Sequence, residues 1–358
     1  MSPFETYLPN HSPPSRRRGI RAALSFALIA IGVFTSPFIY AAEEESPRDV
    51  SADDVWLIST RWSHHYDAPE LRTWRNSEGR WVAATPEEFL ATDDPTVPTV
   101  IWVHGDRVDH WESAGNGMTV YRRLRAHSGG RPFRFVIWSW PSSDIHGVGP
   151  LRETRIKASR SDNEAASLAW FIDRIEPSTP VSLIGYSFGA RIATGALHLL
   201  GGGRLVERQM TERLLPDRHP LRAVLLAAAL DNYSLAQGQR NGLALSQVDQ
   251  LLNLYNPCDE VLKWYSLLCS LHGPEAAGYT GLVGYLGEHR SKVRQVDVSG
   301  YIGDSHDWQD YFYYRGIVAR IAGVALFPDR PAGLGDVEIV EPTTHRVRME
   351  MPRVKLER

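Results

Sequence analysis

The chain has little cysteine and no clustered basic surface along its body. Only two of its 358 residues are cysteines, Cys258 and Cys269, and no Cys/His spacing fits a zinc site, so we expect no bound metal. The formal net charge is −3, and the body has no stripe of basic and aromatic side chains, which argues against a nucleic-acid binder. Internal repeats and long low-complexity tracts are also missing. The composition, 43% hydrophobic and 23% charged, therefore indicates an ordinary globular core.

The two cysteines leave a disulfide open. If both lie on one helix, the helical rise separates them by roughly 16 Å, which is too far for a bond. If Cys258 ends a strand and Cys269 starts a turn, the two can meet. Two buried free thiols are an equal alternative.

The N-terminal segment, residues 1–42, differs from the rest of the chain. A basic stretch at 16–18 precedes an uncharged run at 22–42, and acidic residues follow at 43–45. This layout is typical of a secretory signal peptide. The uncharged run, at about 20 residues, is also long enough to anchor the chain in a bilayer, with the body outside the cytoplasm, and a buried helix is a third alternative. We therefore expect an extracytoplasmic protein of the periplasm or cell envelope, associated with a membrane if the segment is retained.

The remainder divides into three parts. Residues 43–96 are expected to form a linker and an N-terminal β extension with three strands. Residues 97–327 are expected to form the core. Residues 328–358 are rich in proline and charge, which indicates a loosely packed tail. The three strands expected in the extension are 55–60, 71–75 and 79–83.

Within the core, short apolar runs alternate with helical patterns. Uninterrupted apolar, β-branched runs are typical of strands buried on both faces. Their alternation with helices predicts an α/β fold with a mainly parallel twisted sheet flanked by helices. The stretch 231–250 is short, so no large cap domain is expected. The expected strands are 99–103, 135–139, 181–184, 223–227, 248–255 and 293–298, and the expected helical segments are 121–124, 163–174, 188–200 and 309–326.

Residues 185–189 read Gly-Tyr-Ser-Phe-Gly, a Gly-x-Ser-x-Gly pentapeptide. The pentapeptide alone is a weak signal, but an expected buried strand runs into it and a helix of small residues runs out. So sharp a reversal strains the serine and requires small neighbours, and it presents the hydroxyl of Ser187 at the carboxyl edge of the sheet. The N–H of Phe188, at the start of the helix, is placed to bind a developing oxyanion. We predict that Ser187 is a nucleophile; a plain strand–turn–helix corner is the alternative.

Two further groups are needed around such a serine. A second oxyanion donor should come from the loop after strand 99–103, and we predict the backbone N–H of Asp106; His104 in the same loop is expected to pack locally. A hydroxyl also requires a base to remove its proton. His306 is the only histidine in the loop after the last expected strand, so we predict that it is the base.

The base in turn requires a carboxylate to set its tautomer. Asp259 follows an Asn-Pro turn just beyond strand 248–255, which places it at the carboxyl edge of the sheet. Asp231, one strand earlier, is the alternative. We predict Asp259 as the acid.

The chain order Ser187, Asp259, His306 is that of α/β-hydrolases. With His-Gly at 104–105, Gly-x-Ser-x-Gly-Ala-Arg at 185–191 and an Asn-x-x-Asp acid loop, the sequence resembles the α/β-hydrolase superfamily, and within it a bacterial group, over about residues 97–327. The resemblance implies the α/β-hydrolase fold and hydrolysis of an ester, thioester or amide through an acyl-enzyme, without a cofactor. It does not imply a substrate.

Substrate contacts are the least readable part of the sequence. Tyr186, beside the nucleophile, and Trp140, at the end of another expected strand, are predicted to line the pocket. We expect a serine hydrolase acting on a small-molecule or lipid-like ester or thioester. A catalytically silent binding domain and an acyltransferase using the same serine are the alternatives.

Overall fold

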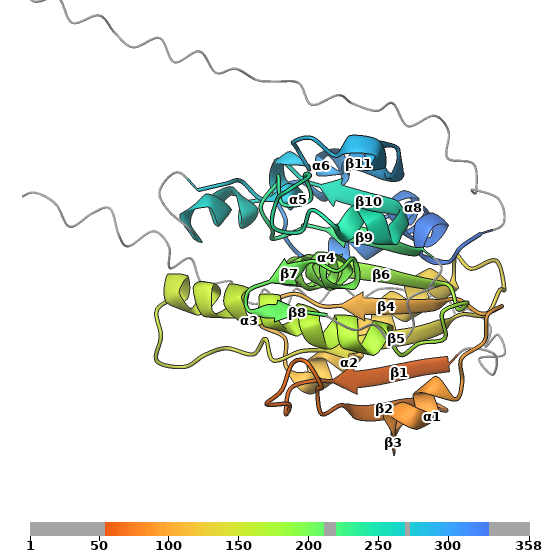
Figure 1. Ribbon diagram of the computed structural model, residues 1–358. Helices are drawn as coiled ribbons and strands as arrows, with labels where there is room; N and C mark the ends of the chain where they lie inside the picture. The colour runs from red at the N-terminus through yellow and green to blue at the C-terminus, as the bar shows by residue number, and fades with distance from the viewer. Residues whose placement is uncertain (1–53, 211–219, 269–272, 329–358) are drawn as a thin grey trace, which may run out of the picture. The chain divides into compact units, whose positions relative to one another are not determined.

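The computed structural model describes residues 54–210, 220–268 and 273–328. A nine-stranded sheet forms its centre, in the order β11-β10-β9-β6-β4-β5-β1-β2-β3 (Figure 1). From β11 to β1 all neighbouring strands are parallel, and β2 and β3 add an antiparallel hairpin at one edge. Its strands are β1 (Asp54–Ser59), β2 (Arg72–Ser77), β3 (Arg80–Ala84), β4 (Thr99–Val103), β5 (Arg134–Ser139), β6 (Val181–Tyr186), β9 (Leu221–Leu226), β10 (Val248–Tyr255) and β11 (Val293–Asp297).

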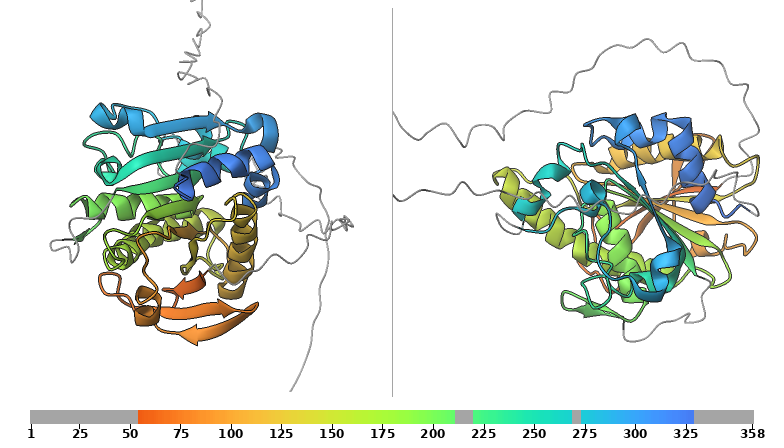
Figure 2. Two further views of the ribbon diagram at one scale, coloured as in Figure 1. Left: turned by 90° about the vertical axis from the view of Figure 1, so that its right-hand side faces the viewer. Right: turned by 90° about the horizontal axis from the view of Figure 1, so that it is seen from above.

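Helices cover both faces of this sheet (Figure 2). On one face α3 and α4 pack against each other, and α4 contacts β6; on the other face α2 contacts β5, and α8 contacts β9. Strands β4, β5 and β6 are buried along their whole length because apolar side chains meet helices on both sides. The expected fold class, a mainly parallel sheet flanked by helices, is thereby confirmed. The helices are α1 (Pro86–Leu90), α2 (His110–Arg125), α3 (Pro150–Ile172), α4 (Phe188–Leu200), α5 (Ala277–Thr280), α6 (Ser299–Ile302), α7 (Trp308–Tyr313) and α8 (Arg315–Ala325).

Short elements occupy the connections. A two-stranded ribbon, β7 (Arg204–Leu205) and β8 (Arg208–Gln209), follows α4. Three 3₁₀ helices, η1 (Ala244–Gln247), η2 (Leu262–Leu268) and η3 (Gly287–Lys292), lie before and after β10. Between β9 and β10 the described chain forms only η1, and no large cap domain occurs within the described ranges.

The expected N-terminal β extension is continuous with the core sheet. β1 pairs in parallel with β5, so residues 54–59 lie inside the sheet and the hairpin forms one of its two edges. The hairpin turns at Glu78 and Gly79, which both have positive φ (50° and 79°). Two successive residues of this kind form the tight turn that matches the twist of paired strands.

Two expected helices have different limits in the structure. The helix expected at 309–326 is wrong as a single element: it divides into α7 and α8 because Tyr314 is extended (φ −83°, ψ 115°). The Tyr314 carbonyl accepts the N–H groups of Ile317 and Val318 and so starts the second helix. The helix expected at 163–174 is the second half of α3, whose first half is polar and extends past the sheet edge (Figure 1).

Several sequence predictions fall outside the described residues. The segment 1–42, with its uncharged run at 22–42, is among them, as are Cys269 and the tail from 329 onward. Cys258 is described and is exposed. None of the helices in the described ranges has the length and apolar character needed to cross a bilayer.

Candidate active site

The candidate nucleophile lies at the turn between β6 and α4. Ser187 has φ 53° and ψ −118°, a conformation that residues other than glycine rarely adopt. Three backbone hydrogen bonds hold it there: its N–H donates to Leu226 (2.9 Å), and its carbonyl accepts from Ala190 (3.1 Å) and Ala229 (3.2 Å). Because the surrounding chain fixes this backbone on both sides, the strained conformation can persist.

The glycines of the pentapeptide allow the close packing of this turn. A Cβ on Gly189 would lie 2.0 Å from the carbonyl oxygen of Val103, and one on Gly185 would lie 2.6 Å from the Cα of Ala190. Real Cβ atoms do not approach backbone this closely. The helix α4 can therefore begin directly against the end of β4 only because both positions lack side chains.

Three loops at the carboxyl edge of the sheet bring the predicted triad together. The Nε2 atom of His306 lies 3.2 Å from the Oγ of Ser187, and its Nδ1 lies 2.6 Å from the Oδ2 of Asp259. Asp259 follows β10, and His306 follows β11. A hydroxyl, an imidazole and a carboxylate in this sequence of contacts have the arrangement that nucleophilic catalysis by a serine requires.

The carboxylate of Asp259 is fully buried and fixed by its own loop. Its Oδ1 accepts the backbone N–H groups of Val261 (2.9 Å) and Leu262 (2.8 Å), while Oδ2 faces His306. The two oxygens thus have separate partners. This leaves the carboxylate a single orientation toward the imidazole.

Two side chains tie the His306 loop to the rest of the site. The side-chain amide of Asn256 donates to the carbonyls of Gly303 (2.9 Å) and Ser305 (3.3 Å), and the hydroxyl of Tyr186 donates to the carbonyl of His306. Sequence reasoning treated Asn256 as a turn former and missed this positioning role. Its place in the Asn-x-x-Asp loop was the available signal.

The two predicted oxyanion donors are backbone N–H groups, one directly after Ser187 and one in the loop after β4. Phe188 is the first residue of α4, and Asp106 lies in the loop after β4. Within the described residues, neither backbone N–H donates to a protein acceptor. Gly105 allows the loop to approach, because a Cβ there would lie 2.8 Å from the ring of Tyr186 and 3.1 Å from the Cβ of Ser187.

The two residues predicted to line a pocket lie in different surroundings. Trp140 is fully buried; its indole N–H donates to the carbonyl of His104 (2.9 Å), and its ring stacks on the His104 imidazole. The structure corrects this prediction, since a fully buried indole supports the loop and offers no surface to a substrate. Tyr186 is 9% exposed and packs between Trp102 and His306.

His104 and Asp231, the other histidine and carboxylate considered for the site, have partners outside the triad. Burial, followed by the charge of Arg61, lowers the pKa of His104 to about 3, so this imidazole stays neutral inside its loop. Asp231 accepts the hydroxyl of Tyr265 (2.9 Å), which also lies 3.2 Å from a guanidinium nitrogen of Arg191. No cluster of three metal-ligating side chains occurs among the described residues.

A separate hollow borders α1 and α3. It has a volume of about 450 Å³ and an apolar lining, and none of the triad residues contributes to it. The candidate chemistry therefore lies elsewhere than this pocket. Its lining residues are Leu71, Pro86, Glu87, Leu90, Trp170, Phe171 and Arg174.

No protein-family model matches the chain, and no curated protein matches it. Solved structures similar in fold include a lipase-esterase related protein from Clostridium acetobutylicum (13% identity, covering 65% of this chain and 96% of that one, TM-score 0.30). Others are a putative hydrolase from Agrobacterium vitis (17%, 71% and 95%, TM-score 0.32) and esterase B from Lactobacillus rhamnosis (14%, 76% and 85%, TM-score 0.35). Similarity at this level carries no information on activity, so the chemistry must be argued from the site itself.

Proposed function

We propose that this protein is a serine hydrolase that cleaves a carboxylic ester or thioester through an acyl-enzyme. The observation that carries the proposal is the chain of contacts from Ser187 through His306 to the buried Asp259. Its support comes from geometry: each of the three groups has the partner that its role requires.

In the proposed first step, the Oγ of Ser187 attacks the carbonyl carbon of the substrate while Nε2 of His306 removes the hydroxyl proton. The carboxylate of Asp259 accepts a hydrogen bond from the Nδ1–H of His306 and stabilises the imidazolium. The carbonyl oxygen becomes an oxyanion, which the N–H groups of Phe188 and Asp106 are proposed to bind. Removing one such donor typically slows the reaction by about 10²–10³-fold.

In the second half of the reaction, the imidazolium of His306 donates its proton to the leaving alcohol or thiol, and the acyl group stays on Ser187. Water then attacks the acyl-enzyme, with His306 again acting as the base. The carboxylic acid leaves, and the free serine is restored. The proton that His306 takes from the water passes to the Oγ of Ser187 as the acyl bond breaks, so one water per ester balances the reaction.

We further propose that the protein acts outside the cytoplasm. This rests on the sequence alone, on the basic stretch at 16–18 and the uncharged run at 22–42. Fractionation of cells, with detection of the mature N-terminus by mass spectrometry, separates a cleaved signal peptide from a retained anchor. Recovery of an uncleaved chain in the cytoplasm would contradict the proposal.

The direct test of the proposed activity is hydrolysis of p-nitrophenyl acetate, butyrate and octanoate by the full chain. Ser187→Ala should reduce the rate to background. Ser178→Ala is the matched control, because within the described part of the chain its hydroxyl donates only to Glu176, in the loop before β6. Absent hydrolysis of all three esters and of the corresponding thioesters would favour a silent binding domain. Acyl transfer to an added alcohol in preference to water would indicate an acyltransferase.

A further inference from the structure

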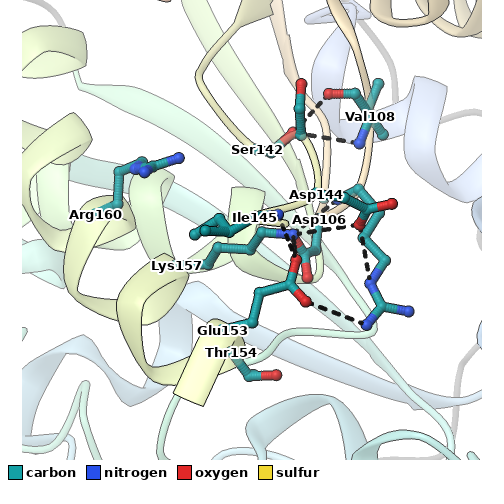
Figure 3. Close-up of polar contacts among 12 residues, drawn as sticks. Asp106, Val108, Ser142, Asp144, Ile145, Glu153, Thr154, Lys157 and Arg160 are labelled. Atoms are coloured by element: carbon teal, nitrogen blue, oxygen red, sulfur yellow. Dashed lines mark hydrogen bonds and ion pairs between the residues drawn. The ribbon is translucent and has the colours of Figure 1, made fainter. Parts of the chain in front are cut away.

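Lys157, in the first half of α3, is a fully buried lysine next to the candidate site. Its side chain has 0% exposure, and its Nζ lies 2.8 Å from the Oδ1 of Asp106 and 2.6 Å from the Oε1 of Glu153 (Figure 3). Asp144 is farther away, at 3.7 Å. A buried ammonium is costly unless carboxylates pair with it, so the position of this cluster is closely determined by its ion pairs.

The cluster joins three separate parts of the chain. Asp106 belongs to the loop after β4, Asp144 to the loop after β5, and Lys157 and Glu153 to the first half of α3. Glu153 also accepts the backbone N–H of Ile145 (3.1 Å), which fixes the second loop to the helix. Figure 3 shows these side chains converging on the Lys157 ammonium.

The loop after β4 depends on these contacts for its shape. The Oδ1 of Asp106, which faces Lys157, also accepts the backbone N–H of Arg107 (2.8 Å). Arg107 has a positive φ of 56°, which is strained for a residue with a side chain. The Asp106 side chain therefore connects the buried ammonium to the backbone at the point where the loop turns.

A second set of contacts closes the same loop from the other side. The N–H of Arg107 also donates to the carbonyl of Ser142 (3.0 Å), and the hydroxyl of Ser142 donates to the carbonyl of Val108 (2.9 Å). The guanidinium of Arg107 lies 3.5 Å from Asp144 and 3.8 Å from Glu153. The two guanidinium pairs of Arg107 are more exposed than the Lys157 pairs and are expected to contribute less, whereas the Ser142 hydroxyl is buried.

We propose that Lys157 is a positioning residue, which holds the Asp106 carboxylate and thereby fixes the Asp106 backbone N–H as the second oxyanion donor. This inference rests on the hydrolase function proposed above. Lys157 touches neither Ser187 nor the reacting atoms, and it acts only through the loop that carries Asp106.

The test uses Lys157→Met, which keeps the length of the side chain and removes its charge. We expect kcat/KM for p-nitrophenyl butyrate to fall 10- to 100-fold, mainly in kcat, with KM changed less than threefold. Lys263→Met is the matched control, because Lys263 forms one exposed ion pair with Glu260. It should leave kcat within twofold of wild type.

A second readout separates an oxyanion effect from a general disturbance. A butyl trifluoromethyl ketone adds to an activated serine and places a negative oxygen where the oxyanion forms, so its affinity should weaken by the same factor as kcat/KM. Asp106→Ala removes the carboxylate that pairs with Lys157 but keeps the backbone N–H of residue 106. It replaces Lys157→Met in the test if that variant does not fold. The double variant should lose no more activity than either single variant, because both break one contact.

The outcomes are distinguishable. If wild type hydrolyses the ester and binds the ketone, but Lys157→Met or Asp106→Ala binds the ketone as wild type does, the inference on Lys157 is wrong and the proposed function stands. If wild type neither hydrolyses the ester nor binds the ketone, the proposed function fails and the inference fails with it.

Discussion

The contacts of Asp259 predict the result of changing it to asparagine. Its Oδ1 accepts two backbone N–H groups, from Val261 and Leu262, so the amide oxygen of Asp259→Asn should occupy that position. The amide NH₂ would then face Nδ1 of His306, now 2.6 Å from Oδ2. Because two donors cannot face each other, the imidazole should carry its proton on Nε2 and could not accept the proton of Ser187.

The wrong tautomer should lower kcat strongly and change the stability of the fold little. For the same substitution in a serine protease triad the loss in kcat is about 10⁴-fold, and we expect a loss on the order of 10³–10⁴-fold here. Since both turn hydrogen bonds are retained, the melting temperature should change by only a few degrees.

The assay is steady-state hydrolysis of p-nitrophenyl butyrate, with thermal unfolding followed by circular dichroism. Asp231→Asn is the control, because Asp231 contacts Tyr265 and not His306. It should keep kcat within a few-fold of wild type. If Asp259→Asn retained more than a tenth of wild-type kcat, the role assigned to Asp259 would be refuted, and a large loss in Asp231→Asn would move that role to Asp231.

Three further predictions concern the fold and the site. Burial raises the pKa of Glu164 to about 8 from 4.5, so the folded state retains a proton that the unfolded state releases above about pH 4.5. Stability should therefore fall between pH 5 and 8, and Glu164→Gln should remove on the order of 3 kcal/mol of that fall in urea unfolding; equal pH slopes in both proteins would contradict this. Gly189→Ala should prevent folding, because its Cβ would meet backbone at 2.0 Å, whereas Gly115→Ala, with open space around its Cβ, should melt at or slightly above the wild-type temperature. Tyr186→Phe removes the hydroxyl that donates to the His306 carbonyl and should lower kcat by about tenfold with the fold retained; an unchanged kcat would show that this hydrogen bond does not position the base.

The strands and the three triad positions were predictable because their signals are local. The central strands β4, β5 and β6 are short, mostly apolar runs buried along their whole length, a pattern that can be recognised from the sequence alone. Ser187 follows β6 directly, Asp259 lies just beyond an Asn-Pro turn after β10, and His306 lies in the segment after β11. The carboxyl ends of parallel strands share one edge, so residues far apart in the sequence could be placed together before any contact was known.

The side chains that hold these groups in place were not predictable in the same way. Lys157 lies 51 positions from Asp106 on a polar stretch of helix, where a lysine ordinarily faces water. Trp140 directly follows β5 at the carboxyl edge of the sheet, but its burial depends on where the His104 loop folds. The break at Tyr314 separates a helix whose Trp308 and Phe312 contact Trp102 from a helix that contacts β9, and the run of apolar residues gives no sign of it. Each of these depends on tertiary contacts that periodicity does not encode.

The most direct test of the account is covalent labelling of the full chain by a fluorophosphonate, followed by intact mass and peptide mapping. We predict one label per chain, on the peptide that contains Ser187, and none in Ser187→Ala. Labelling should also be strongly reduced in His306→Ala, since the hydroxyl then lacks its base. Absent labelling of the folded wild-type chain, or labelling that persists in Ser187→Ala, would contradict the claim that Ser187 is an activated nucleophile.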